Sequence, residues 1–145
     1  MHRSLATVAF LLALPTPVLA ADPGLAFKAA WAPAASKGAD TSLYLTVENG
    51  GAEDAIIRVR CDAANFTELR TVDHGEGFPS ARSIKAIPLA AQGETVLKAE
   101  GFNVRLLQLT NLLAPGDNFD CTLRLRGGGQ HTIAVNVRAP DATVE

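Results

Sequence analysis

The sequence has 145 residues and a formal net charge of −2 at pH 7. This length is typical of one domain, and the slight negative charge argues against binding to nucleic acid, which selects strongly basic surfaces. Beyond its N-terminus the chain has no apolar run of the length that a membrane span requires, so we expect no membrane segment in the mature protein.

The first twenty residues have the features of a secretory signal peptide. A short basic head at residues 1–3 precedes an apolar run over residues 5–14, and Val18-Leu19-Ala20 provides a cleavage site of small residues. We therefore expect residues 1–20 to be removed after Ala20, giving a periplasmic or secreted protein. A retained N-terminal anchor is the alternative.

The rest of the chain divides into three expected parts: an N-terminal leader over residues 21–40, a β-domain over residues 41–138, and a flexible tail over residues 139–145. The leader is rich in Ala and Pro, and we expect Trp31 and Pro33 to pack against the edge of the domain.

Within the domain, apolar and polar residues alternate, which is typical of strands with one buried face. The segments with this pattern or another strand signal are residues 43–47, 57–61, 66–72, 95–97, 102–109, 119–125 and 133–137. The segments 95–97 and 102–109 flank a turn and predict a hairpin. Residues 73–83 predict a loop, and residues 84–89 contain Pro88 and could form only an edge strand. The pattern predicts an antiparallel Greek-key β-sandwich of about seven or eight strands.

The two cysteines, Cys61 and Cys121, both fall on inward phases of their strands. Cysteines of a small exported domain usually pair, because the compartment is oxidising. We expect a disulfide that joins strands across the core, with two buried free thiols as the alternative.

Five different short motifs follow one another along the chain. They are Ala30-Trp31-Ala32, Leu43-Tyr44-Leu45-Thr46-Val47-Glu48-Asn49, Thr67-Glu68-Leu69, the segment from Ile87 to Gly101, and Gly116-Asp117. This order resembles the periplasmic copper chaperone family PCu(A)C, and the resemblance extends from Trp31 to Val137. It implies a cupredoxin-like β-sandwich and a role in copper handling.

The resemblance also implies where a Cu(I) site would lie, since that family uses two His-x-Met pairs and a distant Met. Here the first pair falls on Arg70 and Val72, the second falls on Asn103 and Arg105, and no Met occurs near residues 80–82. A guanidinium stays protonated, and at about 6 Å with an effective dielectric of 20 it would repel a unit charge by roughly 3 kcal/mol. We therefore expect no intact metal site and no cofactor; only the family resemblance suggests copper.

Two further groups of residues are candidates for binding. His74 and His131 are weak metal candidates, and the alternative for each is an ordinary polar position at a loop or strand end. A set of arginines lies mostly on outward strand phases: Arg58, Arg60, Arg70, Arg105, Arg124 and Arg126. It could be a solvated sheet face that protects an edge, or a face that binds an anion or an acidic partner.

No group of catalytic residues is visible in the sequence, so we expect a protein that is not an enzyme. The favoured interpretation is an exported protein of the copper-chaperone family with a degenerate Cu(I) site, which acts by binding, with a periplasmic protein as the expected partner. The alternative is a non-metal binding or structural module that contacts an acidic partner or an anion through its arginines.

Overall fold

The computed structural model describes residues 24–75 and 77–140, and it contains ten strands. The strands are β1 (Leu25–Pro33), β2 (Thr41–Asn49), β3 (Asp54–Cys61), β4 (Ala64–Asp73), β5 (Ser80–Ser83), β6 (Ile87–Leu89), β7 (Gly93–Leu97), β8 (Asn103–Leu109), β9 (Asn118–Leu125) and β10 (Gln130–Arg138). None of the described residues belongs to a helix that could cross a membrane. The expected signal peptide and most of the expected tail lie outside the described residues.

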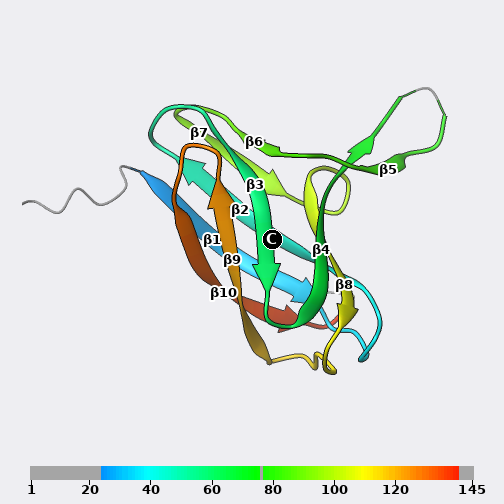
Figure 1. The fold of residues 1–145 in the computed structure, drawn as a ribbon. Coiled ribbons are helices and arrows are strands. Elements are labelled where there is room, and N and C mark those ends of the chain that lie inside the picture. Colours follow the sequence, from blue (N-terminus) through cyan, green and yellow to red (C-terminus); the bar gives the residue numbers. More distant parts are fainter. Residues whose placement is uncertain (1–23, 76, 141–145) are drawn as a thin grey trace, which may run out of the picture.

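The strands form one continuous hydrogen-bonded sheet in the order β5-β4-β8-β2-β1-β10-β9-β3-β6, with β7 also paired to β2. The sheet folds back on itself, so that β3 and β4, which lie near its two ends, come side by side (Figure 1). The predicted β-sandwich is confirmed, with ten strands rather than seven or eight. One pair, β1 with β10, is parallel and places Trp31 opposite Asn136, whereas the other pairs are antiparallel.

Strand β2 belongs to both layers of the sandwich. Its first half, Thr41–Leu43, pairs with β8, and its second half, Leu45–Asn49, pairs with β7 on the same edge. Strands β7 and β8 therefore follow one another along β2 instead of pairing together, and the predicted hairpin around Gly101 is wrong. The turn is still present, since the Lys98 amide donates to the Phe102 carbonyl at 2.8 Å.

Strand β1 lies in the stretch that the sequence suggested as a leader, so the domain begins before residue 41. Residues Leu25–Pro33 gave no strand signal because alanines interrupt the alternation of apolar and polar side chains. The strand forms because it has a partner on both edges, β2 and β10. Ala30 and Ala32 are buried and belong to the core.

The core consists of the inward side chains predicted from the alternation, and they come from both layers. Leu43 on β2, Leu106 on β8 and Leu123 on β9 are fully buried. Each such leucine contributes about 1.5–3 kcal/mol through removal from water. On β8 the buried Val104 and Leu106 alternate with Arg105, so the arginine lies on the outer face of the sheet.

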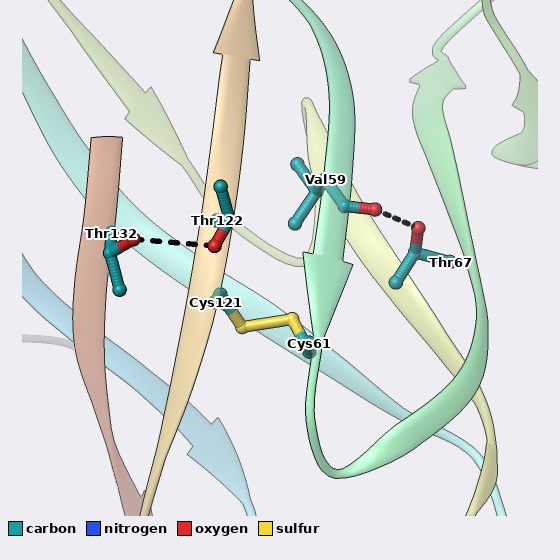
Figure 2. Close-up of a disulfide and its surroundings, with 6 residues drawn as sticks. All are labelled: Val59, Cys61, Thr67, Cys121, Thr122 and Thr132. Carbon is teal, nitrogen blue, oxygen red and sulfur yellow. Dashed lines mark hydrogen bonds between the residues drawn. A yellow bond between two sulfur atoms is a disulfide. The ribbon is translucent and has the colours of Figure 1, made fainter. Parts of the chain in front are cut away.

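The disulfide between Cys61 and Cys121 is present, but it does not cross the core. The two cysteines are directly opposite one another on the paired strands β3 and β9, with 4.1 Å between their Cα atoms (Figure 2). The bond therefore links two neighbouring strands of one layer. The sequence showed that both side chains point inward, but it could not show that the strands are neighbours.

Candidate functional site

The four positions that the resemblance assigns to copper ligands lie together on two neighbouring strands. Arg70 and Val72 are on β4, and Asn103 and Arg105 are on β8. Arg70 is paired directly with Asn103 across the ladder. The antiparallel register thus gathers residues that are far apart in the sequence on the outer face of the sheet.

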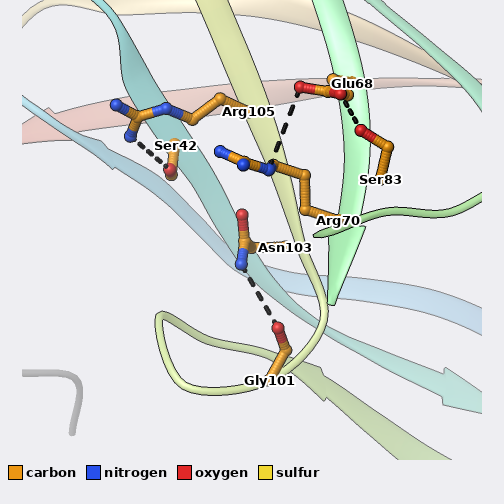
Figure 3. Close-up of polar contacts among 7 residues, drawn as sticks. All are labelled: Ser42, Glu68, Arg70, Ser83, Gly101, Asn103 and Arg105. Carbon is orange, nitrogen blue, oxygen red and sulfur yellow. Dashed lines mark hydrogen bonds and ion pairs between the residues drawn. The ribbon is translucent and has the colours of Figure 1, made fainter. Parts of the chain in front are cut away.

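A carboxylate lies on the same face, beside Arg70 (Figure 3). Glu68 is opposite Arg105 in the ladder, and its Oε2 is 3.9 Å from Nε of Arg70. Its other oxygen, Oε1, accepts a hydrogen bond from the hydroxyl of Ser83 on β5. We call Glu68, Arg70, Asn103 and Arg105 the Arg–Glu cluster.

The remaining contacts of the cluster are to β2 and to the turn that precedes β8. Arg105 donates through Nη1 to the hydroxyl oxygen of Ser42 at 3.2 Å, and the buried Asn103 donates through Nδ2 to the carbonyl of Gly101 at 3.3 Å. Nε of Arg70 is buried and has no hydrogen-bond partner among the described residues. The cluster contains two guanidinium groups and one carboxylate, which is paired with Arg70, so it has an excess of one positive charge.

These residues do not fit a Cu(I) ion. Cu(I) is held by soft thioether, thiolate and imidazole donors, whereas guanidinium groups are donors of hydrogen bonds with no lone pair to offer. Asn103 and Glu68 supply only oxygen or amide atoms, which suit harder cations. No group of three or more His, Cys, Asp or Glu residues that could hold a metal occurs within the described residues.

The structure does not bring the two histidine candidates to a common site. Nε2 of His74, at the end of β4, lies 2.6 Å from the carbonyl oxygen of Glu100. Because a carbonyl only accepts, Nε2 must carry the hydrogen and cannot bind a metal in this arrangement. His131 is on β10, where its ring packs against that of Phe27 at 5.1 Å between centroids.

The arginines predicted to form one face are distributed over two strand pairs. Arg70 and Arg105 belong to the Arg–Glu cluster on β4 and β8. Arg58 and Arg124 are exposed and opposite one another on β3 and β9. Arg60 is the next outward residue on β3, and Arg126 lies in the turn that follows β9.

Sequence analysis missed Glu68, Ser42 and Ser83 as members of the site. The two-residue spacing of Glu68 and Arg70 placed both on one face of a strand, which was a readable signal. Ser42 on β2 and Ser83 on β5 gave no signal in the sequence, because their place in the site depends on strand register rather than on a motif.

The fold is that of PCuAC domains. The copper-bound PCuAC domain from PmoF2 is 21% identical, with a TM-score of 0.65 over 80% of this chain and 93% of that one. The solution structure of CuI-DR1885 from Deinococcus radiodurans is also 21% identical, with a TM-score of 0.67 over 82% of this chain and 80% of that one. At this identity the likeness establishes the fold, and it agrees with the cupredoxin-like sandwich implied by the motifs.

The sequence comparison defines the family more closely. Residues 25–137 match the LpqE-like family, which is described as "Putative lipoprotein LpqE-like". The chain belongs to this family. The match begins at the first residue of β1, in agreement with a domain that includes that strand. No curated protein matches the chain in sequence.

Proposed function

We propose that this LpqE-like protein is exported and acts by binding a partner, and that it does not carry Cu(I) at the position that the PCu(A)C resemblance marks. The features of residues 1–20 support export. The fold supports a relationship to proteins of copper handling, because solved structures with the same fold include the copper-bound PCuAC domain from PmoF2 and CuI-DR1885. No catalytic role is part of this proposal.

One observation carries the proposal: Arg70 and Arg105 occupy the position in question, with Glu68 as the carboxylate paired to Arg70. A cation placed on this face would meet two fixed positive charges and one negative charge. At about 6 Å and an effective dielectric of 20, each guanidinium would cost it roughly 3 kcal/mol, and the carboxylate would offset about one of them. The net electrostatic energy at this face disfavours a cation, and the cluster has no soft donor that would compensate for this cost.

A Cu(I) titration against a competing chelator tests this proposal. We expect the purified protein to bind no Cu(I) more tightly than micromolar. A variant with Arg70→His, Val72→Met, Asn103→His and Arg105→Met restores both His-x-Met pairs and should bind Cu(I) measurably more tightly than the natural chain. Tight stoichiometric binding by the natural chain would refute the proposal, and mass spectrometry of the complex would then locate the metal.

The second candidate is a non-metal module that binds an anion through the Arg–Glu cluster. It is favoured by the excess positive charge of the cluster and by Nε of Arg70, which is buried without a hydrogen-bond partner. Isothermal calorimetry with citrate tests it, since citrate presents several carboxylates to guanidinium groups. The change of Arg70→Ala with Arg105→Ala should abolish the heat of binding, and Arg126→Ala should preserve it. Equal binding by both variants would exclude the Arg–Glu cluster as the anion-binding site.

A further inference from the structure

Strand β5 stands at one end of the sheet, so only one of its two edges is paired. It pairs with β4 through Ser80–Ser83, and the hairpin of these two strands projects from the body of the sandwich (Figure 1). All the residues of β5 are exposed. Its outer edge therefore has no paired strand within the described part of the chain, and it is open to a further strand.

The backbone groups on this outer edge follow from the hydrogen bonds of the inner edge. The Ile84 amide donates to the Leu69 carbonyl of β4 at 2.9 Å. Hydrogen-bonded pairs alternate with non-hydrogen-bonded pairs in an antiparallel ladder, so Arg82 also directs its peptide groups toward β4. The N–H and C=O groups of Ala81 and Ser83 therefore point away from the sheet, where an added strand can pair with them.

The outer edge of β5 lacks the features that usually keep strand edges apart, which are an internal Pro, a bulge or an unpaired charge. Pro79 precedes the strand, and the register between β5 and β4 is regular. The charge of Arg82 is paired, since its Nε lies 2.6 Å from Oδ2 of Asp73. Ala81 is small and uncharged, so a second backbone can approach it closely.

Two apolar residues lie at equal distances along the chain from Ala81. Phe78, three positions before it, is 97% exposed, which is the highest value among the large apolar residues that the structure describes. Ile84, three positions after it, is half-buried beside the core. Aromatic side chains are enriched at protein interfaces. An antiparallel copy of the same segment would therefore bring the exposed aromatic ring to the isoleucine.

We propose that β5 pairs antiparallel with β5 of a second copy of this chain, about a two-fold axis at Ala81. In this register, Ala81 of each copy exchanges backbone hydrogen bonds with Ala81 of the other. Each Ser83 amide then donates to a Pro79 carbonyl, and each Phe78 lies opposite an Ile84. This match of the segment with itself favours a second copy over an unrelated strand.

The contact of two short strands is smaller than a standard protein interface, so we expect a weak and reversible dimer. The axis is perpendicular to the sheet, and it places the Arg–Glu clusters of both copies on the same face, about 20 Å apart by strand spacing. The contact uses backbone groups of β5 and not the guanidinium groups of the cluster. It therefore goes beyond the function proposed above and can be tested separately.

Sedimentation equilibrium of the purified protein, at concentrations from micromolar to millimolar, tests the proposal. We expect a monomer that dimerises reversibly as its concentration rises. Ala81→Lys and Ala81→Glu each place two like charges opposite one another at the axis, so each change should weaken the dimer about fivefold. An equimolar mixture of the two variants should restore association, because opposite charges then meet at the axis.

The apolar contact is tested by Phe78→Ser. This change should weaken the dimer about tenfold or more, because both copies lose the burial of a phenylalanine. The matched control is Leu112→Ser, at a residue that is 63% exposed and outside the proposed contact, and it should leave the dimer unchanged. Circular dichroism checks that every variant is folded, which the exposure of the three positions leads us to expect.

Three results would overturn the proposal. A monomer at every concentration would exclude a second copy as the occupant of this edge. A dimer that both Ala81 variants leave intact, or that their mixture does not restore, would have its axis elsewhere. A dimer that Leu112→Ser weakens as strongly as Phe78→Ser would lie on another surface.

Discussion

The role of Glu68 can be tested by the change Glu68→Gln, which keeps the shape of the side chain and removes its charge. In the structure its carboxylate is 3.9 Å from Nε of Arg70 and directly opposite Arg105. After the change, Arg70 loses its ion-pair partner, and the cluster has two positive charges and no negative one. The variant should therefore be less stable than the natural protein.

The size of the effect follows from the geometry. The side chains of Glu68 and Arg70 are 34% and 30% exposed, so solvent screens their attraction. Partly exposed pairs of this kind contribute up to about 1 kcal/mol, and the hydrogen bond from Ser83 to a charged acceptor contributes about 1 kcal/mol more than one to an amide. We expect a loss of about 1–2 kcal/mol in the free energy of unfolding, or roughly 4–8 °C in Tm.

Urea unfolding of the two proteins measures this difference, with Glu94→Gln as a matched control. Glu94 is exposed on β7 and lies opposite Glu48, so loss of its charge should leave the stability unchanged or slightly raised. In 1 M NaCl the loss in Glu68→Gln should shrink, because the Debye length falls to about 3 Å. If Glu68→Gln and Glu94→Gln unfold at the same urea concentration, the carboxylate does not stabilise the cluster.

Two further predictions concern the sandwich itself. The change of Cys61→Ala with Cys121→Ala removes a disulfide between residues separated by 60 positions, and it should lower the free energy of unfolding by about 2–4 kcal/mol; adding reductant to the natural protein should shift its urea midpoint in the same direction. The change Leu106→Ala leaves a cavity at a fully buried position and should cost about 2–5 kcal/mol by thermal unfolding, whereas Leu112→Ala, at a residue 63% exposed, should cost less than about 0.5 kcal/mol. Equal costs for the two leucines would contradict the assignment of the core.

The alternation of apolar and polar residues was sufficient to predict several strands from the sequence. The strands around Leu43, Leu123 and Val135 all have a clear two-residue period, and their apolar side chains are buried. Pro88 correctly limited its segment to an edge, since β6 is the last strand of the sheet. Strand β5 was missed because Ser80–Ser83 is exposed throughout and has no apolar face. It is a strand only because it pairs with β4.

The candidate site was predictable only as far as the motifs extend. The resemblance marked Arg70, Val72, Asn103 and Arg105, and the structure brings them onto neighbouring strands. The position of Glu68 opposite Arg105 depends on the register between β4 and β8, which no local pattern encodes. The charge of the site was therefore overestimated from the sequence, where two arginines were visible and the carboxylate of Glu68 was not recognised as part of the site.

Strand β2 belongs to both layers of the sandwich, and this has a mechanical consequence. The two layers are joined at β2 by backbone hydrogen bonds to β7 and β8, whereas β3 and β4 on the other side are joined by a short turn and by side-chain contacts. Backbone ladders resist separation more strongly than an unpaired edge does. We therefore expect a change in the spacing of the layers to be smallest at β2 and largest between β3 and β4. On this expectation the hinge of the sandwich and its most adjustable surface lie on opposite sides of the molecule.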